Sequence, residues 1–165
     1  MQKILVLGGV TYDDLVYLEQ FPEPKAQTLF SKGYHSTVGG TGAGKALNLQ
    51  QLEHDVTLHA MIGDDQQGRK VREIFRNTGL HFESDLDPNG TERHINLMDE
   101  AGDRISIYAN HATFEPLLPP DRLEALVTNC DVLVLNIINY CRRAIPIAQA
   151  KGKPLWVDIH DYDGE

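Results

Sequence analysis

Four glycines within six residues, in the segment Gly39-Gly40-Thr41-Gly42-Ala43-Gly44, constrain this chain more than any other feature of its sequence. Glycine allows backbone conformations closed to other residues and leaves little side chain between the backbone and an approaching group. The residues that follow, 45–49, favour a helix beginning at the same point. Backbone N–H groups at a helix N-terminus are ready-made ligand donors, so this segment is typical of a ligand-binding loop.

Three alternatives compete for this loop. Gly39, Gly44 and Lys45 have the spacing of the phosphate-binding loop of nucleotide hydrolases, but Ala46 stands where a Ser or Thr hydroxyl would hold magnesium. The preceding residues, 31–37, also lack the buried apolar strand that this motif follows. A dinucleotide-binding fingerprint is weaker, because Lys45 occupies its third glycine position. The third alternative is a tight strand-to-helix turn that binds nothing.

Two further segments accompany the glycine loop. Residues 3–18 join an apolar run to Gly8, Gly9 and Asp13, and residues 63–68 read Gly-Asp-Asp-Gln-Gln-Gly. In order and spacing, the three segments together resemble the ribokinase-like PfkB family of carbohydrate kinases. The resemblance covers essentially the whole chain, as the N-terminal half or so of a family member. The second signature of that family does not occur in the 165 residues.

Strand and helix patterns alternate along the chain. The expected strands are 4–7, 56–62, a stretch within 130–138, and 155–159; the expected helices are 42–52, 66–78 and 142–150. Alternating βα units predict a parallel sheet covered on both faces, and therefore an α/β protein. The resemblance implies more specifically a three-layer α/β/α ribokinase-like fold, with a Rossmann-like parallel sheet that is incomplete at the C-terminus.

Two segments depart from this alternation and predict a separate small sheet. Residues 27–37 and 91–109 alternate polar and apolar side chains, as half-exposed antiparallel strands do. We expect them to be inserted in a single domain that spans residues 1–165. By the resemblance this sheet is a lid over the sugar site, and in several family members it is also the dimer surface. The apolar face of the hairpin around Ile95 and Ile107 needs a cover, either substrate-side closure or a partner subunit.

Composition and charge narrow the classes of partner. The chain is 41% hydrophobic and 24% charged, with a formal net charge of −9 and no run of Lys or Arg, which disfavours nucleic acid and anionic membranes. Its apolar runs are too short for a signal peptide or a membrane span. Cys130 and Cys141 lack the spacing of a zinc or redox site and are expected to be buried and reduced. We expect a cytoplasmic protein.

The resemblance places a sugar site beyond the first strand. Asp13 is then the clamp for sugar hydroxyls, because a carboxylate at this sheet edge can accept hydrogen bonds from two vicinal hydroxyls. Thr11 stands where many family members have Asn. The alternative is that Asp13 caps a turn. Its neighbour Asp14 is expected to be solvated.

The glycine loop and a later strand end complete the expected substrate site. Gly40, Thr41, Gly42 and Gly44 match the loop that lets a sugar approach backbone N–H groups. Most family members carry Asn at the position of Gly44, where its amide holds a sugar hydroxyl, so this chain is expected to have a roomier site. Asn136, at the end of the strand within 130–138, is expected at the same ligand edge.

Five further residues are candidates for a functional or a structural role. Asp158 and His160 resemble the family's Asp-x-Asn element near the phosphates and metal, with His160 in the Asn place; the alternative is a hydrogen-bonded structural pair. Lys45 could reach a substrate anion, although a solvated lysine is favoured. Asp64 and Asp65 are expected to cap the helix that follows them.

Sugar phosphorylation also needs a base and groups that stabilise the transferred phosphoryl. In the resembled family the base is an Asp in a Gly-x-Gly-Asp segment whose helix N-terminus forms the anion hole, and no such segment occurs here. We therefore predict that this chain contains no catalytic residue and is inactive alone. We expect it to be a fragment, whether engineered, proteolytic or the product of a truncated gene.

The resemblance implies a function for the whole protein. It would phosphorylate a hydroxyl of a sugar, sugar-like compound or nucleoside with ATP and Mg²⁺, and a monovalent cation is a further candidate cofactor. The expected partners are the small-molecule substrate and a second copy bound through the lid, with neither nucleic acid nor membrane. The alternative from another class is a non-catalytic module that binds a sugar or nucleoside without transferring phosphate.

Overall fold

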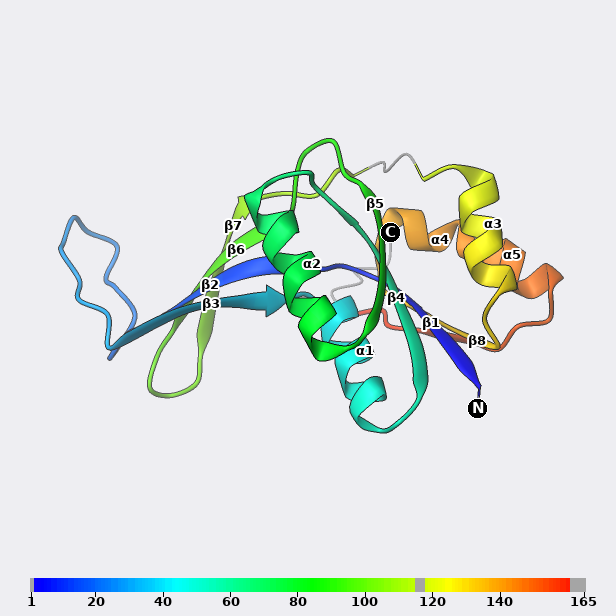
Figure 1. The fold of residues 1–165 in the computed structure, drawn as a ribbon. Helices are drawn as coiled ribbons and strands as arrows, with labels where there is room; N and C mark the ends of the chain where they lie inside the picture. The colour runs from blue at the N-terminus through cyan, green and yellow to red at the C-terminus, as the bar shows by residue number, and fades with distance from the viewer. Residues whose placement is uncertain (1, 115–117, 161–165) are drawn as a thin grey trace.

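The computed structural model describes residues 2–114 and 118–160. The residues outside this description are Met1, 115–117 and 161–165. The last of these segments is the C-terminal end of the domain predicted over 1–165. Two sheets organise the described chain (Figure 1). The larger has five strands in the order β5-β4-β1-β8-β9, and the smaller has four in the order β3-β2-β6-β7.

The larger sheet is parallel throughout. Its strands are β1 (Lys3–Leu7), β4 (Asp55–Ile62), β5 (His81–Leu86), β8 (Val132–Leu135) and β9 (Leu155–Val157). The helices are α1 (Thr41–Gln51), α2 (Gln66–Thr78), α3 (Pro120–Thr128), α4 (Asn139–Arg142) and α5 (Ala144–Ala150). The expected βα alternation is confirmed. The edge strand β5 is absent from that expectation, and the single helix expected over 142–150 is two helices, α4 and α5.

Alternating side chains of β1 divide the core into two layers. Ile4 and Val6 face one cluster of buried residues, which α1 and α2 complete, whereas Leu5 and Leu7 face a second cluster completed by α3, α4 and α5. Successive side chains of a strand point to opposite faces, so a run of four apolar residues is buried on both sides. Helices lie on both faces of the sheet (Figure 1), which confirms the three-layer α/β/α arrangement.

The strand order places a crevice beside the C-terminal end of β1. From β1 the chain continues to β4 and β5 on one side and returns to β8 and β9 on the other. In open α/β sheets such a reversal of strand order leaves a ligand crevice outside the C-terminal ends of the strands. Leu7 is in register with Leu135, so Gly8 and Asn136 leave the sheet side by side.

The glycine loop brings the start of α1 against the end of β1. Gly40 has φ of 92°, a left-handed conformation that favours glycine. A Cβ on Gly42 would lie 2.7 Å from the backbone carbon of Gly8. The helix can therefore begin at Thr41 only because these positions lack side chains.

The Gly-Asp-Asp segment starts α2, as expected. Asp65 is the N-cap, and its Oδ1 accepts a hydrogen bond from Gly68 N–H at 2.7 Å. The other oxygen, Oδ2, accepts from the backbone N–H of Thr91 at 2.7 Å. This carboxylate therefore caps a helix and also fixes the chain that enters the smaller sheet.

The smaller sheet, called the lid below, contains β2 (Thr11–Tyr17), β3 (Gly33–Gly39), β6 (Arg93–Met98) and β7 (Arg104–Asn110). The hairpin of β6 and β7 is confirmed. The strand expected over 27–37 begins only at Gly33, and residues 27–32 form no strand. The central strand, β2, was not expected, because its two adjacent aspartates are depleted in strands.

Asp14 corrects the expectation of a solvated side chain. It is 9% exposed, and its carboxylate accepts hydrogen bonds from Tyr34 (2.8 Å), Ser36 (2.6 Å) and Arg93 (2.7 Å). Burial alone would raise the pKa of Asp14, but the hydrogen bonds from Ser36, Arg93 and Tyr34 outweigh it and lower the pKa. An ionised aspartate therefore joins β3, β2 and β6.

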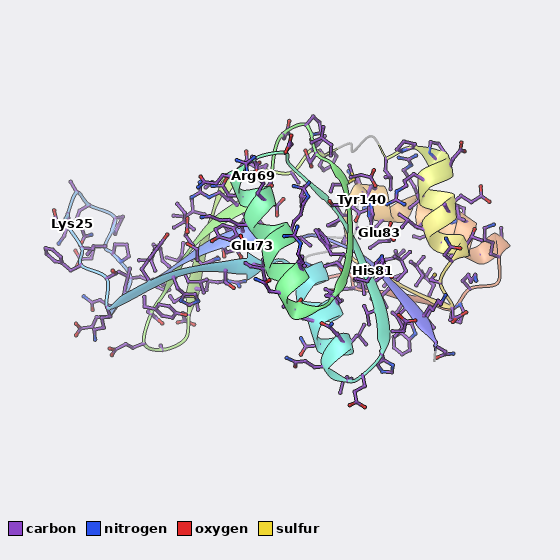
Figure 2. The ribbon with its side chains drawn as sticks, in the orientation of Figure 1. Lys25, Arg69, Glu73, His81, Glu83 and Tyr140 are labelled. Carbon is purple, nitrogen blue, oxygen red and sulfur yellow. The ribbon has the colours of Figure 1, made fainter. Side chains whose placement is uncertain are left out.

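A buried histidine connects β4 to β5 and the second core cluster. His59 is fully buried, its Nε2 lies 2.9 Å from Asp85, and its backbone oxygen accepts a hydrogen bond from Tyr140 at 2.9 Å. Arg122 in turn donates hydrogen bonds to Asp85 (3.1 Å) and to Glu83 (2.6 Å). Tyr140 and Glu83 are labelled in Figure 2. Burial lowers the pKa of His59, so this ring is neutral at pH 7.

Two other expectations concern the thiols and membrane spans. Cys130 and Cys141 are buried free thiols, and burial raises the pKa of Cys141 to about 12, so both are unreactive, reduced core residues. Among the residues that the structure describes, no helix is long and apolar enough to cross a membrane.

Candidate functional site

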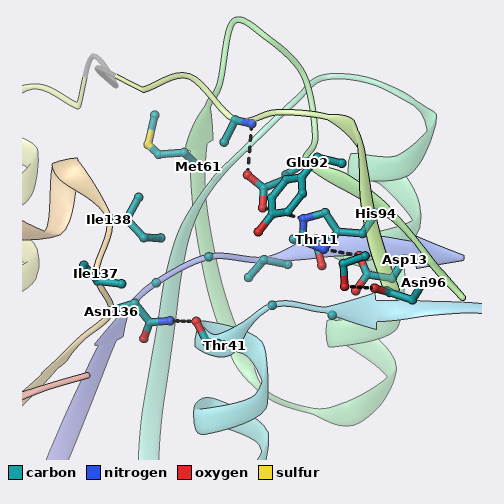
Figure 3. Close-up of a pocket in the computed structure, with 18 of the residues that line it drawn as sticks. Thr11, Asp13, Thr41, Met61, Glu92, His94, Asn96, Asn136, Ile137 and Ile138 are labelled. Carbon is teal, nitrogen blue, oxygen red and sulfur yellow. Dashed lines mark hydrogen bonds and ion pairs between the residues drawn. The ribbon is translucent and has the colours of Figure 1, made fainter. Parts of the chain in front are cut away.

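A cleft of about 710 Å³ lies where the larger sheet meets the lid. Its floor includes Gly8, Gly9 and Asn136, which follow β1 and β8, and its other wall is formed by lid strands (Figure 3). The lid side chains that line it are Thr11, Asp13, Leu15, Thr37, His94, Asn96, Met98, Arg104, Ser106 and Tyr108. The cleft thus occupies the crevice that the strand order predicts.

Three buried oxygen atoms in this cleft lack a hydrogen-bond partner within the described residues. They are Thr11 Oγ1, Asp13 Oδ1 and Asn136 Oδ1. Leaving a buried polar atom unpaired costs about 1 to 3 kcal/mol, and most buried polar groups in proteins are paired. All three atoms can accept hydrogen bonds, so a ligand rich in donors, such as a polyol, would satisfy them together.

Gly39 makes room for the Asp13 carboxylate. Asp13 lies on β2 and is 8% exposed. A Cβ on Gly39 would come within 2.0 Å of Asp13 Oδ2, a distance that no side chain could occupy. The first glycine of the loop is therefore required by the orientation of the aspartate.

The predicted loop residues fall into two groups. Gly40 and Thr41 line the cleft, and Thr41 Oγ1 accepts a hydrogen bond from Asn136 Nδ2. Gly42 and Gly44 are not among the described residues that line it. The N–H of Gly42 donates to Gly9 O at 3.0 Å and that of Gly44 donates to Gly40 O at 3.0 Å, so both are used within the chain.

Gly44 instead faces a second groove beside Trp156 and Asp158. No atom lies within 4 Å of the position that its Cβ would take, so a larger side chain would fit there. The extra space expected from this glycine is therefore present, but it opens on the second groove.

Asp158, which directly follows β9, contacts two side chains. Lys45 forms an ion pair with its Oδ2, and His160 Nδ1 lies 2.9 Å from its Oδ1. The hydrogen bond from Lys45 holds the pKa of Asp158 well below its usual range. The expectation of a solvated Lys45 is wrong, because this side chain reaches back to Asp158. His160 also lines the cleft, while Asp158 lines the second groove.

The polar side chains of β6 and β7 were not expected as site residues. His94 and Asn96 on β6, with Ser106 on β7, face the cleft, and Ser106 donates to Asn96 Oδ1 at 2.7 Å. Alternation along β6 was the available signal, since residues two apart share one face.

His94 contacts two carboxylates and an aromatic ring in the cleft. Its Nε2 lies 3.1 Å from Glu92 Oε1, its Nδ1 lies 3.5 Å from Asp13 Oδ1, and its ring centroid is 4.1 Å from that of Tyr108. The hydrogen bond with Glu92 raises the pKa of His94 above its ordinary value, against the opposing effect of burial, and the charge of Asp13 adds to the rise. Figure 3 shows Glu92, His94 and Asp13 on the same wall.

These features define a class of protein: an α/β domain with a lid and a polar cleft whose buried oxygen atoms can accept hydrogen bonds from a ligand. Residues 1–158 match the pfkB family carbohydrate kinase, and the chain belongs to this family. The family expected from the three sequence segments is confirmed.

Individual relatives agree with this membership. The chain is 33% identical to the acarbose 7(IV)-phosphotransferase of Actinoplanes sp., over 98% of this chain and 54% of that protein. It is 31% identical to a nucleoside kinase of Methanothermobacter thermautotrophicus, over 50% of this chain and 26% of that protein. The chain therefore spans about half the length of the first of these relatives and less of the second.

Solved structures agree as well. A microbiome-derived acarbose kinase superposes with a TM-score of 0.89 at 30% identity, over 99% of this chain and 55% of that one. Ribokinase from Giardia lamblia superposes with a TM-score of 0.83 at 16% identity, over 99% of this chain and 52% of that one. The ribokinase similarity establishes the fold alone, and the expected ribokinase-like fold is confirmed.

Proposed function

We propose that the whole protein transfers a phosphoryl group from ATP to a hydroxyl of a sugar or sugar-like substrate, and that this chain provides the sugar-binding cleft. The observation that carries the proposal is a set of three buried acceptors in one cleft that lack a hydrogen-bond partner within the described residues: Thr11 Oγ1, Asp13 Oδ1 and Asn136 Oδ1. His94 Nδ1 lies 3.5 Å from Asp13 Oδ1, which is longer than a good hydrogen bond. Sugars present several hydroxyl donors within a few ångströms, whereas anionic ligands would face unfavourable lone pairs here. Family membership supplies the reaction class.

Each cleft residue has a binding role in this proposal. Asp13 accepts hydrogen bonds from two vicinal hydroxyls, and such charge-assisted bonds are short and strong. Thr11 and Asn136 accept from further hydroxyls, and the Asn136 amide is oriented by its bond to Thr41. Gly40 keeps the loop backbone close to the substrate. Gly42 acts indirectly, by letting α1 start against Gly8.

ATP, Mg²⁺ and a monovalent cation are proposed for the whole protein from the family alone. Within the described part of the chain, no group of three or more His, Cys, Asp or Glu side chains is placed to hold a metal ion. Asp158 offers one carboxylate, which Lys45 and His160 already engage. We therefore assign the metal and the nucleotide no ligand set within these residues.

Substrate class is proposed from the relatives. The acarbose kinases are similar to this chain over 98% and 99% of its length, so a sugar-like oligosaccharide is the first candidate. A nucleoside is the second candidate, because the matching nucleoside kinase aligns with half of this chain.

The test is Asp13→Asn in the whole protein, with acarbose, ribose and adenosine as substrates and ATP as donor. We expect kcat/KM for the preferred substrate to fall at least about tenfold, which is about 1.4 kcal/mol, with little change in melting temperature. Asp64→Asn is the matched control, since Asp64 is exposed on the surface. A lower melting temperature with unchanged kcat/KM would make Asp13 a structural residue and defeat the proposal.

Two further measurements separate the proposal from a non-catalytic binding module. Sugar binding without any phosphorylation by the whole protein would favour the module. The 165-residue chain alone is expected to show no ATP-dependent phosphorylation, since general-base and electrostatic contributions are each worth about 100-fold or more. Coupled turnover by the isolated chain would contradict this expectation.

A further inference from the structure

The position of His94 between two carboxylates favours its protonated form. One ring nitrogen faces Glu92 and the other faces Asp13, at 3.1 Å and 3.5 Å. A neutral imidazole carries a single N–H, so one nitrogen would direct its lone pair at a carboxylate oxygen. Only the imidazolium can donate toward both carboxylates. The geometry therefore fits a cationic His94.

Two of the contacts of His94 are firm. Glu92 is anchored by the backbone N–H of Ala112, which donates to its Oε2 at 3.1 Å, and the ring of Tyr108 packs on the imidazole. The remaining contact, to Asp13 Oδ1, is longer than a good hydrogen bond. The ring is thus held in place by Glu92 and Tyr108, and its contact with Asp13 is the weakest of the three.

The charged and titratable groups around His94 come from every neighbouring element. β2 contributes Asp13, and Glu92 immediately precedes β6. β7 contributes Tyr108 and Arg104, whose charge opposes the imidazolium. The segment after β7 contributes His111, whose ring stacks on Tyr108 with the centroids 5.2 Å apart. The two carboxylates outweigh Arg104, in agreement with the raised pKa of His94.

We propose that His94 is a positioning residue of the sugar site: its cationic form holds the Asp13 carboxylate in the orientation that accepts sugar hydroxyls, so sugar affinity depends on pH near neutrality. The inference rests on the proposed function and adds control of the same site by one proton. When His94 is neutral, it keeps the N–H that points to Glu92. Its Nδ1 lone pair then repels Asp13 Oδ1, and the carboxylate turns away from the hydroxyls.

The sign of the pH dependence follows from this scheme. Because the protonated form binds sugar better, affinity is highest below about pH 6.5, the ordinary histidine pKa, and falls as pH rises through the raised pKa of His94. Linkage requires the reciprocal effect: sugar binding raises the pKa of His94 further and takes up protons.

The first measurement is an NMR titration of the histidine rings in the unliganded protein. We expect His94 to titrate above the ordinary range and its pKa to fall in Asp13→Asn. An ordinary or lowered pKa for His94 would overturn the inference without any reference to sugar. His81, an exposed histidine 3.2 Å from Glu83 on β5, is the internal comparison for a histidine–carboxylate pair outside the cleft.

The second measurement is calorimetric titration with acarbose and with ribose, without ATP, at about pH 6 and about pH 8.5. We expect the Kd of the sugar that binds to rise at least about fivefold at the higher pH, with proton uptake on binding. His94→Gln should remove the pH dependence, and His81→Gln should leave it intact. The comparison within the unaltered protein needs no variant, so a destabilised His94→Gln protein would not block the test.

The outcomes separate the inference from the function on which it rests. Equal sugar affinity at both pH values in the unaltered protein, or pH dependence retained in His94→Gln, overturns the inference and leaves the sugar site intact. Failure of the unaltered protein to bind either sugar or adenosine at any pH overturns the proposed function itself, and the inference with it.

Discussion

The larger sheet and the lid are built from different interactions. Leu58 in β4 is fully buried between strands and helices, and β1 is apolar on both faces. The lid is held at its centre by Asp14, with Tyr34, Ser36 and Arg93 as partners, and Ile107 on its edge strand is 47% exposed. One sheet is stabilised by burial and the other by directional polar contacts. The cleft lies between the two sheets. Its floor therefore belongs to the sheet that is stabilised by apolar burial, and its wall belongs to the lid, which is stabilised by polar and charged contacts.

The largest expected effect comes from the core of the larger sheet. Leu58→Ala should lower the free energy of unfolding by about 2 to 5 kcal/mol, because transfer and cavity terms add at a fully buried site. Ile107→Ala, the lid counterpart, should cost less than about 1 kcal/mol, because much of that side chain already contacts water. Denaturant unfolding of the two variants checks the contrast, which fails if the two losses are equal.

A second, smaller loss is expected at the centre of the lid. Asp14→Ala removes three hydrogen bonds to a charged group and leaves Arg93 without its partner. We expect a loss of about 2 to 3 kcal/mol, concentrated in faster hydrogen exchange of β2, β3 and β6.

Asp64→Ala is the control for the Asp14 variant, since it removes an exposed aspartate outside the lid. Uniformly faster exchange in both sheets would show that the lid does not open as a separate unit. A loss below about 0.5 kcal/mol would show that the Asp14 cluster contributes no more than surface polar groups do.

The same contrast explains how much of the fold could be predicted from the sequence. The run Ile4 to Leu7 is apolar without interruption. Such a run is typical of a parallel strand that is covered by helices on both faces of its sheet. β2 was missed because Asp13 and Asp14 contradict the usual composition of strands. Their charged partners, His94 beside Asp13 and Arg93 beside Asp14, are far away in the sequence, and no local pattern marks them as partners.

The candidate site was predictable where it depends on backbone shape and not where it depends on pairing. The glycine loop predicted a helix N-terminus at this point, where α1 begins, and Asn136 was expected at the strand end where it lies. Lys45 was misjudged because its partner, Asp158, follows a strand more than a hundred residues later in the chain. His94 was not expected in the site, because its contacts with Asp13 and Glu92 arise from the way three segments of the lid come together.

Two histidines make the two sheets respond oppositely to pH. Burial lowers the pKa of His59 in β4, so its contribution to stability is complete above about pH 6.5 and is lost as pH falls through its folded pKa. The Glu92 hydrogen bond raises the pKa of His94 in β6, so its contribution is complete below about pH 6.5 and is lost as pH rises through its folded pKa.

Hydrogen exchange, corrected for its intrinsic pH dependence, tests this opposition. We expect protection of β6 to decline on the alkaline side and protection of β4 to decline on the acidic side. The acidic loss combines with protonation of Asp85 and Glu83 at lower pH, since the pKa values of both carboxyls are lowered. Parallel changes in the two strands at every pH would contradict the assignment.

The smallest effect on stability is expected on the outer face of the lid, where the effect on association should nevertheless be clear. Ile105 and Ile107 are 41% and 47% exposed on β7, and they are in register with Leu97 and Ile95 on β6. Because Ser106 between them faces the cleft, this apolar row faces outward, and a second copy of the lid could cover it.

We expect the protein to self-associate through this face. Ile107→Asp should make it monomeric in light scattering while changing the free energy of unfolding by no more than about 0.5 kcal/mol. Leu86→Asp, at a 60% exposed position on the larger sheet, is the control and should leave association unchanged. A strictly monomeric unaltered protein at high concentration would show that the exposed row needs no partner, and the lid would then differ from the larger sheet in tolerating uncovered apolar surface.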